Sequence, residues 1–320
     1  MFFSTILSVL IIHTERLVAA SEKLLDSEKQ SICDLKHWIK GRYVKNVFKP
    51  QYLSHEPLSL SKSSRVLKSQ ELQYFSKAES RECLRNRKIW FVGDSYIRCF
   101  FNGFMDVLRE NYRTPHAVRK EHIEKEVTNI QFIPKQLSFV RRAYMEDYNI
   151  TITNVGRFEF SLGENIDAVK QLFLNIKDDD LIVFNLLIHD NKKTWVEKQF
   201  KGNLHSAETA YLKNVKNIVE WLKNQNPKGK FVWTTSNSYN EMKVSARYRK
   251  YQANKRILRI SSNARNIWIQ ANFPVLDSFH LTGVACRSCT FDGGHFNSMT
   301  NWAISQLLLN FFCRPRSCNS

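Results

Sequence analysis

The alternation of short apolar runs with helix-length amphipathic stretches constrains the fold of this chain more than any other feature. Runs with the length of a buried strand occupy residues 89–92, 150–155, 181–187, 231–235 and 267–276. Helical spacing of apolar residues is found at 96–112, 164–176, 207–224, 245–265 and 297–312. This order predicts an α/β fold in which a central parallel sheet is covered by helices on both faces.

The domain organisation follows from where this alternation starts. The chain has 320 residues, 43% of them hydrophobic, which is enough for one large domain with an extension. We assign residues 81–320 to the domain and residues 21–80 to an irregular N-terminal extension that wraps the core. Residues 114–148 interrupt the alternation with charged residues and Pro134, and predict an insertion, such as a hairpin, near the exit of the first strand.

The first residues have the composition of a targeting segment. Residues 1–12 are almost wholly apolar but too few to span a bilayer, and Val18, Ala19 and Ala20 supply small residues for cleavage. The pattern predicts a signal peptide over residues 1–20, and hence a secreted or Golgi-luminal protein. Because positive charge is missing before the apolar run, an uncleaved anchor and a mitochondrial leader stay open as alternatives.

Cysteine usage fits an oxidising compartment. The chain has seven cysteines, so at least one thiol lies outside any internal pairing. We expect Cys99 to be that thiol, because it lies within the helix predicted at 96–112. Cys286 and Cys289 have zinc-ligand spacing, but a single such pair favours disulfides over zinc, and no metal site is predicted.

The basic charge of the chain limits its partners. The formal net charge is +18, and the lysines and arginines are dispersed along the sequence. No basic arm, Cys/His finger or aromatic RNA-binding run accompanies this charge, so a nucleic-acid partner is not expected. For a secreted protein, acidic glycans and membrane surfaces are the corresponding anionic partners.

Gly93-Asp94-Ser95 lies where the first predicted strand ends and the first predicted helix begins. In open parallel sheets this carboxyl edge collects ligands and chemistry, because helix N-termini point their unpaired N–H groups into it. Asp and Ser are also the usual N-cap residues. Taken alone, the tripeptide therefore fits a nucleophile and a helix cap equally well.

A partner for the serine stands directly before the last predicted helix. Asp292 and His295 are three residues apart on a glycine-rich turn, so the carboxylate can hold Nδ1–H of the imidazole and leave Nε2 free. This pattern predicts Ser95 as nucleophile, His295 as base and Asp292 as the orienting carboxylate. A second pair, Asp277 and His280, is the alternative, although the apolar residues around His280 favour a structural role.

These motifs resemble the SGNH/GDSL hydrolase superfamily. The resemblance lies in Gly93-Asp94-Ser95, in the Ser-x-x-Arg from Ser95 to Arg98, and in Asp292-x-x-His295 before the final helix. Within the superfamily the chain is similar to the PC-esterase branch, which includes the luminal domain of sialate O-acetyltransferase and the neurexophilin-and-PC-esterase-domain proteins; the shared features there include Cys33, Cys83, Trp38 and the ending at 308–313. The similarity covers roughly residues 33–313, and it implies a three-layer flavodoxin-like fold and a serine that becomes acylated.

The resemblance also implies further site residues. The oxyanion donors would be the N–H of Ser95, a glycine after the second strand, which fits Gly156, and an asparagine after the third, for which Asn185 is the candidate. The chain departs here from the family's Gly-x-Asn-Asp pattern, so His189 is carried as a second polar candidate, and a structural Asn185 bonded to backbone is the alternative. Arg98 would orient a carboxylate-bearing glycan, or else anchor its helix through a buried salt bridge.

The predicted function is serine-dependent transfer of an acyl group, such as acetyl, to or from glycan hydroxyls. The resemblance favours a glycan O-acetyltransferase, and the charge of the chain favours an acidic sugar. A secreted carbohydrate esterase and an inactive glycan-binding protein of the same fold are the alternatives. No bound cofactor is expected; an acyl donor such as acetyl-CoA would supply the acetyl group. A membrane-embedded partner fits a transferase, since related transferases often carry membrane segments.

Overall fold

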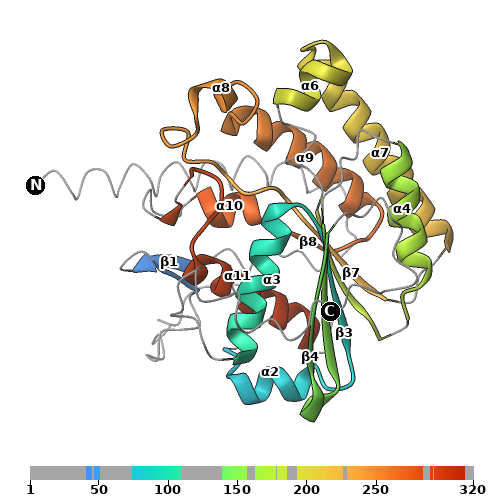
Figure 1. Cartoon of the computed structure of the whole chain (residues 1–320), viewed down its shortest axis with the longest axis vertical. Coiled ribbons are helices and arrows are strands. Elements are labelled where there is room, and N and C mark those ends of the chain that lie inside the picture. The colour runs from blue at the N-terminus through green and yellow to red at the C-terminus, as the bar shows by residue number, and fades with distance from the viewer. Residues whose placement is uncertain are drawn as a thin grey trace, which may run out of the picture. The chain divides into compact units, whose positions relative to one another are not determined.

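The structure is a computed structural model of the chain, shown in Figure 1. It describes residues 41–44, 47–50, 74–109, 139–156, 163–177, 179–185, 193–225, 229–283, 289–290 and 292–313. The predicted signal peptide, most of the N-terminal extension, the first part of the insertion and His189 lie outside these ranges. Within them, none of the helices is long and apolar enough to cross a membrane.

A six-stranded sheet forms the centre of the described domain, in the order β4-β5-β3-β6-β7-β8. Its strands are β3 (Lys88–Gly93), β4 (Phe139–Met145), β5 (Ile150–Gly156), β6 (Leu181–Asn185), β7 (Lys230–Thr234) and β8 (Val275–Leu276). All neighbours pair in parallel except β4, which pairs antiparallel with β5 at the edge. The five parallel strands, counted along the chain, have the order 2-1-3-4-5, which is the order of flavodoxin-like folds. The predicted fold class is confirmed.

Helices cover both faces of this sheet, as Figure 1 shows. On one face lie α4 (Gly163–Leu174), α7 (Leu204–Gln225) and α9 (Asn254–Gln270), and on the other α3 (Ser95–Arg109) and α11 (Ser298–Cys313). The strand residues divide between the faces by their alternation. In β3, Trp90 and Val92 pack with the first set of helices, whereas Ile89 and Phe91 pack with the second.

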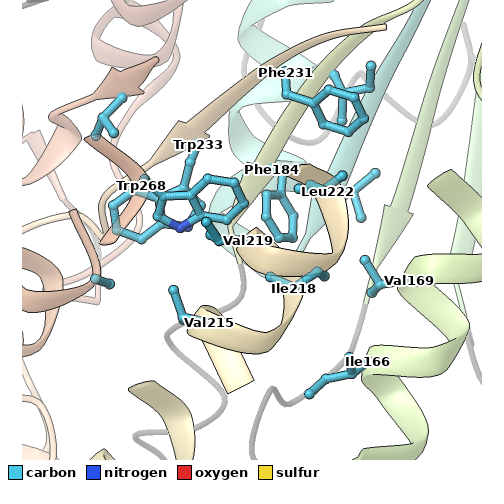
Figure 2. Packing of buried hydrophobic residues seen from close by; sticks show 14 of the residues in the cluster. Ile166, Val169, Phe184, Val215, Ile218, Val219, Leu222, Phe231, Trp233 and Trp268 are labelled. Atoms are coloured by element: carbon cyan, nitrogen blue, oxygen red, sulfur yellow. The ribbon is translucent and has the colours of Figure 1, made fainter. Parts of the chain in front are cut away.

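Large aromatic side chains pack together with aliphatic ones in the first of these two cores (Figure 2). The rings of Trp233 on β7 and Trp268 on α9 stack with their centroids 6.1 Å apart, and Phe184 on β6 meets the Trp268 ring edge to face at 5.4 Å. All three side chains are fully buried. Burial of these rings packs α9 against β6 and β7, near the carboxyl ends of both strands.

One long apolar stretch was predicted wrongly. The run at 267–276 was expected to be a strand, but its first part is the end of α9, and only Val275–Leu276 pairs with β7. Trp268 continues the buried face of α9 that Ile257, Ile260 and Ala264 begin. The apolar residues at the start of the run therefore pack as part of a helix and not as a strand.

The sequence predicted one helix over 245–265, but the structure has two helices there. These are α8 (Ala246–Arg249) and α9, and the turn between them buries Tyr251. The short helices α2 (Lys77–Cys83), α6 (Lys193–Phe200) and α10 (Ser278–Gly283) were not predicted.

The remaining described elements are a pair of short strands, a short helix and a hairpin. β1 (Gly41–Val44) and β2 (Val47–Pro50) form an antiparallel pair, and the capping box of Ser76 and Glu79 starts α2 (Lys77–Cys83). The described end of the predicted insertion is β4, which a 3-10 turn, η4 (Glu146–Tyr148), joins to β5 as a hairpin. Phe139 thereby pairs with Gly156 at the exit edge of the sheet.

A disulfide joins helices α2 and α11. Cys83, at the end of α2, is bonded to Cys313, at the end of α11, across a sequence separation of 230 residues. Cys289 is also in a disulfide. Cys99 is a buried thiol on α3, which agrees with its expected place outside the disulfides.

Candidate active site

The serine lies at the turn between β3 and α3, at the carboxyl edge of the sheet. The strand ends at Gly93, which pairs with Asn185 of β6 so closely that a Cβ atom would come within 2.0 Å of the Asn185 carbonyl oxygen. Only glycine fits there. Asp94 then caps the helix, because its Oδ1 accepts a 2.8 Å hydrogen bond from the backbone N–H of Tyr96. Asp94 therefore fills the capping role, and the Ser95 hydroxyl stays available for other contacts.

A closed turn carries the acid and the imidazole. Thr290 and Phe296 form an antiparallel bridge across its base, and the Asn297 N–H donates to the Cys289 carbonyl at 2.8 Å. Asn297 also caps α11, since its Oδ1 accepts from the Thr300 N–H at 3.0 Å. The turn is thus fixed at both ends by backbone contacts, directly before the last helix.

Inside this turn, Asp292 holds the imidazole of His295. One carboxylate oxygen, Oδ1, accepts from the backbone N–H groups of Gly294 at 3.0 Å and His295 at 2.9 Å. The other, Oδ2, lies 2.6 Å from His295 Nδ1. Partial burial raises the pKa of Asp292, but the hydrogen bonds from the His295 ring and the two N–H groups outweigh burial and lower that pKa to about 2. Asp292 is therefore an acceptor only, and Nδ1 must carry the donated proton.

The structure brings this pair to the serine. His295 Nε2 lies 2.7 Å from Ser95 Oγ, although the two residues are 200 positions apart in the chain. Because Nδ1 is protonated, Nε2 is left as the acceptor for the Ser95 hydroxyl. The side chains of His295 and Asp292 are 21% and 42% exposed, so a solute can reach the site.

The alternative pair, Asp277 and His280, lies elsewhere. It follows β8, three strands away from β3 in the sheet, and its own Nδ1–Oδ2 distance is 2.7 Å. Thr235 Oγ1 donates to Asp277 at 3.1 Å. Burial raises the pKa of Asp277, but hydrogen bonding to His280 outweighs it and lowers the value; the same hydrogen bond raises the pKa of His280. This pair has the orienting geometry, but the serine is hydrogen-bonded to His295.

The two residues expected to help bind an oxyanion flank the serine's strand. Gly156 ends β5 and pairs with Gly93 from one side, and Asn185 ends β6 and pairs with Gly93 from the other. The Asn185 side-chain amide donates to the Thr234 carbonyl of β7. This bond to backbone is the structural role weighed above.

Arg98 lies on α3, one turn after Ser95, and is half-buried. Its backbone N–H donates to the Asp94 carbonyl at 3.1 Å, as the first turn of the helix requires. The described residues contain no group of three or more His, Cys, Asp and Glu side chains that could hold a metal ion.

Two site residues were missed in the sequence. Tyr96 packs its ring against the His295 ring, with centroids 5.2 Å apart, and Tyr239, from the segment after β7, packs against Tyr96 at 6.1 Å. Tyr96 directly follows the motif serine, so its position in the sequence could have drawn attention to it. For Tyr239 no motif or spacing gave an indication.

Comparison with known proteins gave matches only among solved structures. No protein-family model matches the sequence, and no curated protein is significantly similar to it. Similar structures include the acetylxylan esterase Axe2 from Geobacillus stearothermophilus, with 11% identity and a TM-score of 0.43 over 74% of this chain and 99% of that chain. A lipase/acylhydrolase from Enterococcus faecalis has 13% identity and a TM-score of 0.41, over 72% and 99%. A lipolytic protein of the G-D-S-L family from Veillonella parvula has 14% identity and a TM-score of 0.42, over 72% and 100%.

Ser95, His295 and Asp292 form a series in which the carboxylate holds the imidazole and the imidazole holds the serine hydroxyl, at the carboxyl edge of a flavodoxin-like sheet. This is the arrangement that activates serine for attack on a carbonyl carbon.

Proposed function

We propose that this chain is a serine-dependent ester enzyme that moves acyl groups through an acyl-enzyme. Two linked hydrogen bonds carry the proposal: His295 Nδ1–H donates to Asp292 Oδ2 at 2.6 Å, and the Ser95 hydroxyl donates to His295 Nε2 at 2.7 Å. A capping serine would bond to the backbone of its own helix, whereas here Asp94 provides the cap. The order of the motifs, and their resemblance to SGNH/GDSL hydrolases and the PC-esterase branch, supports the same assignment.

The first half-reaction forms the acyl-enzyme. Ser95 Oγ bonds to the acyl carbon while His295 Nε2 takes its proton, and Asp292 stabilises the resulting imidazolium. The tetrahedral intermediate collapses as the bond to the leaving alcohol or thiol breaks, and His295 returns the proton to the leaving atom. The acyl group is then held as an ester on Ser95.

The second half-reaction releases the acyl group. Water or a sugar hydroxyl attacks the acyl carbon and gives its proton to His295, and collapse of the second intermediate returns that proton to Ser95 Oγ. Each negative oxygen would be met by the N–H of Ser95, with Gly156 and Asn185 as further donors. Loss of one such donor typically lowers kcat by a factor of about 100 to 1,000.

The finer proposal is an O-acetyltransferase acting on glycan hydroxyls. It rests on the resemblance of the motifs to PC-esterases and on the net charge of +18, which favours acidic sugars such as sialic acid or uronates. Arg98 and His189 would bind the substrate, and acetyl-CoA is a candidate donor. The Cys83–Cys313 disulfide supports a site in the secretory pathway, where a membrane-embedded partner could supply the donor.

Covalent labelling tests the ester-enzyme proposal. A fluorophosphonate should form an adduct on Ser95 of the folded chain, as read by mass spectrometry of the labelled peptide. S95A should give no adduct, and H295A should label at least about 1,000-fold more slowly, because the base is missing. H280A is the matched control and should label like the wild-type protein. No adduct on the folded wild-type chain would favour the inactive glycan-binding alternative.

A second experiment separates transferase from hydrolase. The protein is incubated with an acetyl donor and either sialylated or uronate-containing glycans, and the products are read by mass spectrometry. Acetylated sugar that is absent with S95A supports the transferase. Free acetate without acetylated sugar would instead favour a carbohydrate esterase.

A further inference from the structure

The residue after the nucleophile contacts the base. The Tyr96 ring meets the His295 ring in a T-shaped contact, with centroids 5.2 Å apart and an interplanar angle of 67°. Ser95 Oγ contacts the same imidazole at Nε2. The first turn of α3 thus fixes the imidazole at two points, once through a hydrogen bond in the ring plane and once through ring packing.

The ring of Tyr239 packs against the ring of Tyr96. The two rings are 6.1 Å apart, and their side chains are 2% and 6% exposed. Asn254, the first residue of α9, holds the backbone of Tyr239 on both sides: its Oδ1 accepts from the Tyr239 N–H, and its Nδ2 donates to the Tyr239 carbonyl, each at 2.7 Å. Tyr239 is therefore anchored to the first residue of α9.

The same pair backs the turn that carries the imidazole. A Cβ atom on Gly294 would come within 2.5 Å of Tyr96 Oη and 2.9 Å of a Tyr239 ring carbon. Asn240, next to Tyr239, donates its N–H to the Gly293 carbonyl at 2.7 Å. The turn between Asp292 and His295 thus packs directly against the tyrosine pair at Gly294.

The phenol groups of Tyr96 and Tyr239 stay protonated near neutral pH. Burial raises the pKa of both groups, and for Tyr239 it outweighs the hydrogen bond to Tyr96, which lowers the pKa. Neither phenol can therefore act as a base near neutral pH, and Tyr96 meets the imidazole through its ring.

We propose that Tyr96, supported by Tyr239, is a positioning residue that sets the orientation of the His295 imidazole. The inference rests on the proposed function. The bonds to Asp292 and to Ser95 both lie in the imidazole plane, so rotation of that ring weakens both at once. A T-shaped aromatic contact opposes the rotation, and small misplacements of a catalytic group are costly to the rate.

Three variants test this role. Y96L removes the ring, Y96F keeps the ring and removes only the hydroxyl, and F104L removes a ring from the same helix far from the turn. Phe104 is fully buried and packs on Phe91 at 5.4 Å, in the other core. Each variant is measured for hydrolysis of p-nitrophenyl acetate, for the rate of fluorophosphonate labelling, and for Tm.

We expect Y96L to lower kcat and the labelling rate by about tenfold, equivalent to about 1.4 kcal/mol, at unchanged KM. Y96F should retain both within about twofold, and F104L should lower Tm without lowering kcat. Folded Y96L with wild-type kcat, or a tenfold loss in F104L as well, would overturn the inference and leave the proposed function standing. The low-field NMR signal of the His295–Asp292 proton gives a reading without turnover: it should broaden in Y96L and persist in Y96F, and the reverse would also refute the role.

Discussion

Replacing Asp292 by asparagine should invert the tautomer of His295. Asp292 Oδ1 accepts two backbone N–H groups, from Gly294 and His295, and an amide can satisfy both only with its own oxygen. The amide nitrogen must then occupy the place of Oδ2, 2.6 Å from Nδ1 in the wild-type protein. A donor facing Nδ1 forces the imidazole proton onto Nε2, which then faces Ser95 as a donor and cannot act as a base.

The expected cost of D292N is therefore that of losing the base while the structure stays intact. Such a tautomer change lowers kcat by about 1,000- to 10,000-fold, or about 4 to 5.5 kcal/mol of transition-state stabilisation. The assay is hydrolysis of p-nitrophenyl acetate at pH 7, together with ¹⁵N shifts of the His295 ring, which report the tautomer directly. A kcat within tenfold of the wild-type value, or a ring that keeps its proton on Nδ1, would refute this reasoning.

Three other predictions use the same protein. H280A should keep kcat within about threefold while H295A loses at least about 1,000-fold, in the same ester assay; the opposite order would exchange the roles of the two histidines. The pKa of Asp292 is lowered from 3.8 to about 2, so its contribution to stability is present above pH 4 and is lost as the pH falls towards 2. The full shift corresponds to about 2.4 kcal/mol, which we reduce to about 1 kcal/mol because the side chain is 42% exposed. Because the folded-state pKa of about 2 lies below pH 3, urea unfolding at pH 7 and pH 3 should show about half of this loss in the wild-type protein and none of it in D292N. Replacing both Cys83 and Cys313 by serine should lower the free energy of unfolding by about 2 to 5 kcal/mol, and an unchanged Tm would contradict a stabilising role for that disulfide.

The sequence predicted those strands that appear in it as short apolar runs between helical stretches. The strands β3, β5, β6 and β7 are short apolar runs between helical stretches, and each was found within one or two residues of its described bounds. The error at 267–276 arose because apolar residues at the end of a buried helix look like a strand when the window begins at Ile267. The decisive contact, Trp268 stacked on Trp233, joins two distant segments and leaves no local trace.

The residues of the candidate site divide in the same way. Ser95, Asp292 and His295 could be proposed because they occur in short motifs, one at the end of a predicted strand and one directly before the last predicted helix. The preference for His295 over His280 could only be weighed, since both have an aspartate three residues earlier. The support from Tyr239 and Asn254 could not be predicted, because it depends on how the segment after β7 folds back against α3.

The distance of 200 residues between Ser95 and His295 has a consequence for the nascent chain. While the polypeptide is being synthesised, the serine emerges long before its base, and an unassisted serine hydroxyl is a poor nucleophile. It gains its reactivity only when the final turn and α11 pack against α3, so folding itself acts as the activation step. The bond between Cys83 and Cys313 then joins the two ends of the folded domain and makes that step hard to reverse.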